Sequence, residues 1–159
     1  MNDGGEHPVR RFEPGGDAFR WDAVDLMAYK HEGSAPFRDV TRQTLFKGPD
    51  MRSELRYFEV AAGGHSTLER HEHMHAVLVL RGLGACLVGT GVHRIGAFDL
   101  VTVPPLTWHQ FRASANAPLG FLCMVDAQRD RPQLPDAHVL EELQRHPVIA
   151  RFLAGDPVV

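Results

Sequence analysis

The sequence predicts an all-β protein, a small antiparallel barrel or sandwich, from its pattern of short strands, and its length and composition predict that this is one globular domain. Short apolar or alternating runs recur through the middle of the chain, and glycine or proline residues separate them. The chain has 159 residues, enough for one substantial core. Its apolar fraction of 43% and charged fraction of 23% are ordinary for a globular domain. We therefore expect a single barrel domain at residues 21–135.

The elements can be predicted in order along the chain. Residues 1–20 are rich in Gly, Pro and charge, so we expect an N-terminal arm that is disordered or extended. Lys47–Asp50 and Gly63–Gly64 are predicted turns. Alternating or apolar runs predict strands at 21–29, 40–46, 55–61, 77–80, 85–88, 92–95, 100–103, 109–112 and 120–125.

The last part of the chain has a different pattern. Residues 136–159 are expected to form a short helical tail that packs on the barrel. Asp136 can cap a helix, and the apolar residues that follow it have helical spacing. Pro147 either ends this helix or begins a second short turn.

Composition argues against several classes of function. A formal net charge of -3 provides no basic surface, so we expect no nucleic-acid partner. Cys86 and Cys123 are the only cysteines, and their spacing suggests neither a disulfide framework nor a cysteine zinc motif. No apolar run is long enough to cross a bilayer and no signal peptide is visible, so we expect a cytoplasmic protein without a membrane partner.

The stretch from Gly63 to Gly82 carries the chemistry. Glu69, His71, His73 and His75 occupy every second position, and in an extended strand alternate side chains share one face. Three imidazoles and a carboxylate on one face suit a divalent metal. The alternative is a histidine-rich surface strand, but the apolar run that follows directly favours the metal site.

The glycine and histidine spacing resembles the first cupin motif, which has the order Gly, His-x-His, Glu, Gly. Gly63 and Gly82 fix the register, and Glu69-x-His71 and His75 then fall at the ligand positions. A second motif is matched by the stretch Gly96–His109, with its Gly-Ala-Phe-Asp turn, its prolines and its closing histidine. The resemblance implies a jelly-roll (double-stranded β-helix) barrel. It also implies that Glu69, His71, His75 and His109 bind the metal.

Two positions depart from the common cupin pattern. Glu69 stands where the first histidine is usual, and His75 stands where the glutamate is usual. A competing register uses His71 and His73 as the His-x-His pair, but Val77 then falls at a ligand position. His73 itself remains open: it lines the pocket, orients a ligand or replaces Glu69 as a ligand.

At a finer level the chain resembles the bacterial cupins that act as 1-methylthio-xylulose 5-phosphate sulfurylases, or methylsulfurylases. The stretches Glu54–Val60, Gly63–His75, Trp108–Phe111 and Phe121–Pro132 carry this likeness. It implies removal of the methylthio group from a sugar phosphate, to give 1-deoxy-xylulose 5-phosphate. The implied cofactor is manganese, with Fe, Ni, Co or Zn as alternatives, and the implied co-substrate is a thiol such as glutathione. It also implies a homodimer, since cupins often pair through sheet edges.

The residues allow such chemistry. Cys123 is the candidate thiol, although a buried cysteine in an apolar strand is commonly a plain core residue. His73 is a candidate proton donor. Several arginines are available for the phosphate and none stands out. Two other functions stay open: another metal-dependent cupin enzyme (a sugar-phosphate isomerase or a dioxygenase), or a cupin that binds a small molecule without catalysis.

Overall fold

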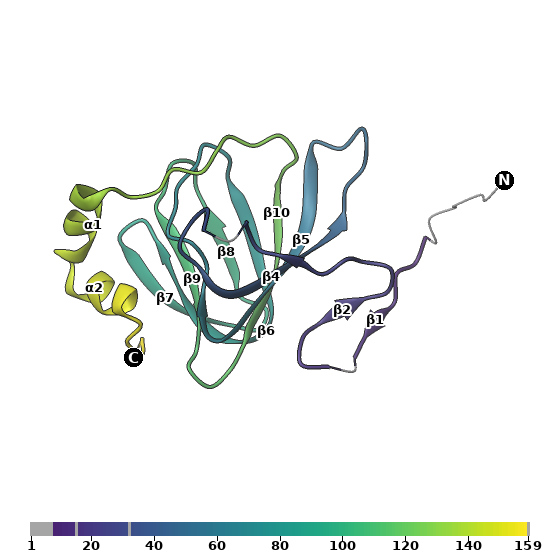
Figure 1. Cartoon of the computed structure of the whole chain (residues 1–159), viewed down its shortest axis with the longest axis horizontal. Helices are drawn as coiled ribbons and strands as arrows, with labels where there is room; N and C mark the ends of the chain where they lie inside the picture. Colours follow the sequence, from purple (N-terminus) through teal and green to yellow (C-terminus); the bar gives the residue numbers. More distant parts are fainter. Residues whose placement is uncertain (1–7, 15, 32, 159) are drawn as a thin grey trace.

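The structure is a computed structural model that describes residues 8–14, 16–31 and 33–158 (Figure 1). Residues 1–7 of the predicted N-terminal arm lie outside this range. No helix in the described part of the chain is long and apolar enough to span a membrane. The elements in order are β1 (Phe12–Glu13), β2 (Arg20–Trp21), β3 (Met27–Ala28), β4 (Arg38–Phe46), β5 (Ser53–His65), β6 (His75–Val88), β7 (Gly91–Gly96), β8 (Leu100–Val103), β9 (His109–Ala113), β10 (Leu119–Asp126), α1 (Ala137–Gln144) and α2 (Pro147–Ala154).

The barrel is closed by its two longest strands. β6 pairs with β10 and β8 along its first half and with β9 and β7 along its second half. β5 pairs with β10, β9 and β4, so that β5 and β6 share the same two partners and complete the ring. All these pairings are antiparallel. The prediction of an all-β barrel with a short helical C-terminus is confirmed.

Glycines bend the long strands where the sequence predicted that they would end. Gly63–Gly64 was expected to be a turn, but β5 continues through it to His65. Gly63 has a φ of 76°, and a Cβ on Gly64 would lie 2.6 Å from the carbonyl oxygen of Arg38. A side chain does not fit at Gly64, and the left-handed backbone at Gly63 favours glycine. Likewise, the strands predicted at 77–80 and 85–88 are one strand, β6, which passes through Gly82 at a φ of 82°.

The strand predicted across the histidine stretch is wrong. Residues 66–74 form no regular strand, and β6 begins only at His75. This loop is held in other ways: Glu69 and His109 exchange two backbone hydrogen bonds, and Arg70 and Gln133 exchange two more. The alternation of residue types in the sequence therefore did not predict the backbone conformation of this loop.

The strand predicted at 21–29 is also wrong over most of its length. β2 ends at Trp21, and Ala23 has a φ of 55°, which breaks the extended backbone before β3 begins at Met27. β1 and β2 form a small hairpin that lies on the opposite side of the barrel from the helices (Figure 1). Its aromatic rings Phe19 and Trp21 pack on Tyr57 of β5, with ring centroids 6.0 and 5.0 Å away.

Two cores stabilise the molecule. The larger one fills the barrel with side chains from β4, β5, β6, β9 and β10, among them Val60, Val79 and Phe121. The smaller one lies under the helices, where Ile149 and Phe152 of α2 pack with Leu87 of β6. Asp136 caps α1 as predicted, because its side chain accepts a hydrogen bond from the Val139 amide at 2.8 Å. Pro147 begins α2, the second of the two alternatives in the sequence.

Candidate metal centre

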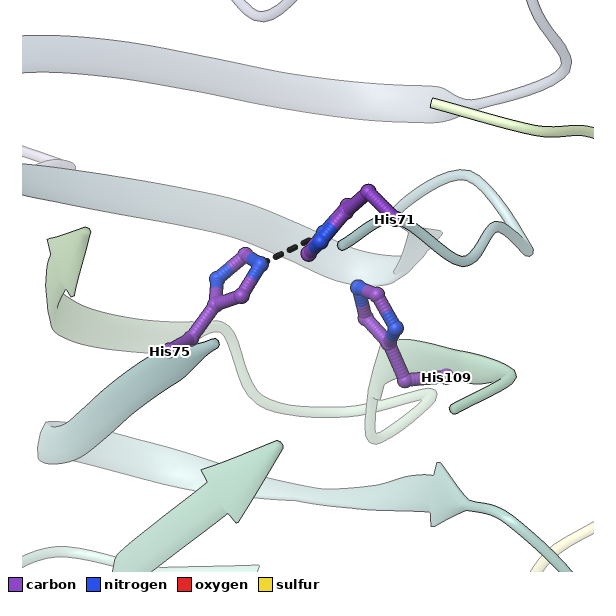
Figure 2. Close-up of side chains that lie close together, drawn as sticks. All are labelled: His71, His75 and His109. Carbon is purple, nitrogen blue, oxygen red and sulfur yellow. Dashed lines mark hydrogen bonds between the residues drawn. The ribbon is translucent and has the colours of Figure 1, made fainter. Parts of the chain in front are cut away.

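Three imidazoles converge inside one end of the barrel. His71 comes from the 66–74 loop, His75 is the first residue of β6 and His109 is the first residue of β9 (Figure 2). The Nε2 atoms of His71 and His75 lie 2.6 Å apart. The His109 ring lies 4.9 and 5.2 Å from theirs, centroid to centroid. One nitrogen from each ring falls within 4.8 Å of the others.

Hydrogen bonds fix which nitrogen of each ring faces the centre. The Nδ1 of His71 lies 2.7 Å from the His73 carbonyl oxygen, and the Nδ1 of His109 lies 2.9 Å from that of Thr107. A carbonyl oxygen can only accept, so both Nδ1 atoms carry the proton and both Nε2 atoms present a lone pair. His75 places its Nδ1 3.2 Å from the Cys123 sulfur. This arrangement, with Nδ1 held and Nε2 free, is how metal-binding histidines are usually oriented.

The electrostatics keep these rings neutral. Burial lowers the pKa of His71 to about 4 and of His75 to about 2, and the neighbouring imidazoles add to both shifts. Burial also lowers the pKa of His109. Neutral imidazole is the form that binds a metal. Two Nε2 lone pairs at 2.6 Å repel each other unless a proton or a cation lies between them. The donor set therefore fits a divalent ion that accepts imidazole ligands.

Glu69 lies in the same cavity, but its carboxylate does not belong to this cluster of nitrogens. The side chain is buried and forms an ion pair with Lys30. Its backbone is paired with His109, so it is adjacent to a ligand position. The prediction that Glu69 binds the metal stays a prediction, and Lys30 is a partner that the sequence did not reveal.

His73 lies beside the cluster. Its ring stacks on that of His71 with centroids 3.6 Å apart, and its Nδ1 lies 2.7 Å from Asp130 Oδ1. The amide of Glu72 donates to the same carboxylate at 2.9 Å. This amide is the main reason that the pKa of Asp130 falls to about 2, and the hydrogen bond from His73 adds to it. His73 thus lines the cavity beside His71, but one ligand atom of His73 also lies within 4.8 Å of those of His71 and Asp130, so all the alternatives for His73 stay predictions.

A cavity of about 220 Å³ opens onto the three histidines. Cys123 faces it from β10, and burial raises the pKa of its thiol while the nearby Arg56 guanidinium opposes that rise. Phe111 lines the cavity. Trp108 packs against the core under the helices, and Tyr57 packs beneath the N-terminal hairpin. The described residues that line the cavity are Tyr29, Lys30, Val40, Arg42, Arg56, Phe58, Ser66, Thr67, Glu69, His71, His73, His75, Val77, His109, Phe111, Phe121, Cys123, Arg129, Asp130 and Pro132.

Comparisons with known proteins agree with this architecture. The cupin domain family matches residues 56–125. The 1-methylthio-D-xylulose 5-phosphate methylsulfurylase of Rhodospirillum rubrum is 56% identical over 146 residues, which cover 92% of this chain and 94% of that protein. The chain belongs to the cupin family.

Solved cupin structures superpose closely on the barrel. A cupin-2 domain protein from R. rubrum is 56% identical, with a TM-score of 0.83 and coverage of 91% of this chain and 97% of that one. A cupin 2 conserved barrel domain protein from Rhodopseudomonas palustris is 53% identical, with a TM-score of 0.84 and the same coverages. The cupin resemblance that the two glycine-histidine motifs suggested is therefore confirmed, and so is the likeness to a methylsulfurylase.

Sequence reasoning missed three polar residues of this cupin site. Tyr29 is the last residue of the predicted strand at 21–29 and Lys30 follows it directly, and both reach the cavity from outside the two motifs. Asp130 lies between Arg129 and Arg131 in the sequence, and nothing in that local pattern indicates that it contacts His73. Their signal is weak because each lies in irregular chain, where no periodicity predicts which way a side chain points.

Proposed function

We propose that this cupin is a methylsulfurylase that converts 1-methylthio-xylulose 5-phosphate to 1-deoxy-xylulose 5-phosphate. Manganese is the proposed metal and a thiol such as glutathione the proposed co-substrate. The observation that supports this most directly is the 56% identity to the R. rubrum methylsulfurylase over nearly the full length of both chains. The cluster of three histidines, with a cysteine in contact with one of them, supplies the groups that the reaction needs.

The proposed metal ligands are His71, His75 and His109, with Glu69 as a candidate fourth. A divalent ion held there would supply Lewis-acid stabilisation for negative charge on the substrate's ketone oxygen. In this arrangement His75 also acts on Cys123. With its Nε2 facing the metal site, its Nδ1–H donates toward the Cys123 sulfur 3.2 Å away and stabilises the thiolate form.

The proposed step breaks the bond between sulfur and the carbon next to the ketone. The Cys123 thiolate attacks the methylthio sulfur, forming a disulfide between Cys123 and the methylthio group. The electron pair of the broken carbon–sulfur bond passes to the sugar as an enolate. One external thiol displaces methanethiol from this disulfide by bonding to Cys123, and a second releases Cys123 as the external disulfide forms. Two thiols are thus oxidised for each substrate reduced.

The enolate must gain a proton at its terminal carbon. His73 lines the cavity and is held by Asp130, so we assign it the delivery of that proton. Phe58, Phe111 and Phe121 line the same space and exclude water from it. An apolar wall strengthens the interaction between the developing negative charge and the positive groups nearby.

The experiment that tests this function is turnover of 1-methylthio-xylulose 5-phosphate by manganese-loaded protein with glutathione present. Product formation should need both the metal and the thiol, and methanethiol should appear in equal amount to the deoxy sugar. No product under these conditions, with stoichiometric metal bound, would contradict the proposal. An isomerase or dioxygenase would instead act on the sugar without releasing methanethiol.

The variant Cys123→Ser tests whether Cys123 is the nucleophile or only orients the His75 ring. Serine can still accept the hydrogen bond from His75, so metal content should be unchanged. Turnover should fall at least about 1,000-fold if the sulfur is the nucleophile. Cys86→Ser is the matched control, because Cys86 is also buried but lies outside the cavity. Wild-type turnover by Cys123→Ser would reject the nucleophilic role.

A further inference from the structure

Arg56 is a buried cation that faces the metal cavity without a counter-ion. Its exposed fraction is 8%, and it lines the same space as the three histidines. Among residues 8–14, 16–31 and 33–158 it forms no ion pair with a carboxylate, and its Nε is buried without a hydrogen-bond partner. Its guanidinium lies over the Phe58 ring, 5.1 Å from the centroid, and interacts with the Cys123 thiol, and neither is a carboxylate. An unpaired buried charge is costly, so a protein that keeps one generally uses it.

A second guanidinium lies next to it. Arg42 of β4 pairs in register with Phe58, two residues from Arg56 on β5, so the two arginines are diagonal neighbours on the inner face. Arg42 also lines the cavity, and its Nε is likewise buried without a partner. Burial lowers the pKa of Arg56 most, and the charges of Arg129 and Arg42 lower it further, while Cys123 and Glu54 oppose this shift. Like charges placed side by side in a cavity imply an anion between them.

The carboxylates near this pair are already engaged. Glu54 is bound by Arg129 and Lys47, and Glu69 by Lys30. Glu59 accepts from Tyr57 and pairs with Arg81 on the outer face of the sheet. The charge of Glu54 partly offsets that of Arg56, but none of these carboxylates forms an ion pair with Arg42 or Arg56, so we look to a ligand for the anion between them.

We infer that Arg42 and Arg56 form the subsite for the phosphate of the sugar-phosphate substrate, an inference that rests on the proposed function. Two guanidinium forks present paired donors that match phosphate oxygens. The other charged residues of the cavity are matched by partners of opposite charge, Lys30 with Glu69 and Arg129 with Glu54, whereas Arg42 and Arg56 lack a carboxylate partner that a phosphate dianion would supply. The single thiolate of Cys123, by contrast, would balance only one of the two cations.

The position of the subsite suits a ketose that carries its phosphate at the far end. Cys123 is in register with Val77 on one side and Arg56 on the other, so β10 separates the arginines from β6, where His75 lies. Across two strand spacings the β6 and β5 backbones lie about 10 Å apart. The carbonyl can thus reach the histidines and the phosphate the arginines, with Cys123 between them.

Binding of xylulose 5-phosphate tests the subsite without any methylthio chemistry. Titration calorimetry on the metal-loaded protein should show that Arg56→Met weakens binding about 10- to 100-fold. Free xylulose should bind wild type and variant equally weakly. Arg38→Met is the matched control: Arg38 lies on β4 but is exposed and pairs with Asp39, so its loss should leave affinity unchanged. Arg56→Lys keeps the charge without the fork and should weaken binding less than Arg56→Met.

Equal affinity of wild type and Arg56→Met for xylulose 5-phosphate would overturn the inference. Because methionine removes an unpaired buried charge, we expect this variant to fold and to melt no lower than wild type. Arg42→Met applies the same test independently should Arg56→Met be unstable, and unchanged affinity there would overturn the inference too. Arginine-dependent binding of xylulose 5-phosphate by a protein that does not turn over the methylthio sugar would contradict the proposed reaction and leave the subsite standing.

Discussion

At the scale of single residues, hydrogen bonds orient the rings of His71 and His75 so that their Nε2 atoms face the metal centre. Each ring is oriented by a hydrogen bond that its Nδ1–H donates, to the His73 backbone carbonyl for His71 and to the Cys123 sulfur for His75. We therefore predict that His71→Ala, His75→Ala and His109→Ala each abolish stoichiometric metal. His73→Ala removes the proposed proton donor but none of the preferred metal ligands, so metal should remain bound with affinity lowered about 10- to 100-fold at most. Metal analysis of the purified variants measures both outcomes.

His138→Ala provides the control, since His138 is exposed on α1, far from the cavity in sequence and position. Full metal content in His71→Ala, His75→Ala and His109→Ala alike would refute the site. Loss of metal from His73→Ala, with Glu69→Ala harmless, would instead favour the register in which His71 and His73 form the ligand pair.

Residue types and spacing predicted most of this site. The two motifs placed His71, His75 and His109 in one set, and the structure brings their nitrogens together. Spacing could not show that Lys30 neutralises Glu69, or that Asp130 holds His73. Those partners lie 39 and 57 residues away along the chain, in irregular segments. Long-range side-chain contacts of this kind depend on tertiary packing, which no local pattern encodes.

Strand β6 depends on one glycine at its bend. Gly82 has a φ of 82°, and a Cβ there would lie 1.7 Å from the Pro118 carbonyl oxygen. Gly63 has a similar φ of 76°, but a Cβ would meet nothing within 4 Å. We predict that Gly63→Ala lowers the free energy of unfolding by about 1–2 kcal/mol, from backbone strain alone. Gly82→Ala should cost roughly 3 kcal/mol or more, because the backbone of the neighbouring segment must also move.

Chemical denaturation of the two glycine variants measures this difference. Similar losses for both would show that the close approach of Pro118 to Gly82 is not a constraint. Gly48→Ala is a useful reference, since Gly48 lacks a positive φ and its nearest neighbour is the flexible Met51 side chain.

Helix α2 is attached to the barrel through Phe152. Its ring is 1% exposed, packs in the small core with Leu87, and lies under the Arg112 guanidinium. Phe152→Ala should lower the free energy of unfolding by about 3–5 kcal/mol. Metal content should not change in the folded protein, because α2 contributes nothing to the metal cavity. Val148→Ala on the exposed face of the same helix should change stability by no more than about 0.5 kcal/mol. Thermal unfolding measures the stability of both variants. A similar loss of stability in Phe152→Ala and Val148→Ala would contradict the role of Phe152 in attaching α2 to the barrel.

Elements were predictable where one physical signal dominated. Turns with Gly or Pro, and strands with β-branched residues, predicted β7, β8, β9 and β10 at nearly their observed bounds. The failures share a cause. Gly63, Gly64 and Gly82 bend strands without ending them, and only the approach of another chain segment distinguishes a bend from a turn. The 66–74 loop alternates in sequence, yet backbone bonds to β9 and to Gln133 set its conformation.

At the scale of the whole molecule, the free energy of unfolding depends on whether the metal-site histidines are protonated. His71 and His75 stay neutral in the folded chain, because their pKa values fall to about 4 and about 2 from an ordinary 6.5. The unfolded chain binds protons at these residues once the pH falls below about 6.5. The unfolded state therefore holds more protons, and the metal-free protein should lose stability as pH falls from about 6.5 toward 4. The slope approaches about 1.4 kcal/mol per pH unit for each histidine.

Urea unfolding of the chelated protein at several pH values between 7.5 and 4.5 measures this slope. The stabilisation is fully present above the unfolded pKa, so the curve should be flat near pH 7.5 and steepen below 6.5. His71→Gln should reduce the slope, whereas His138→Gln should not. Adding manganese should raise stability most at neutral pH and progressively less in acid, because protons compete with the metal for the same Nε2 atoms. A pH-independent stability in both His71→Gln and wild type would mean that the buried imidazoles are not held neutral, and the metal centre would lose its electrostatic basis.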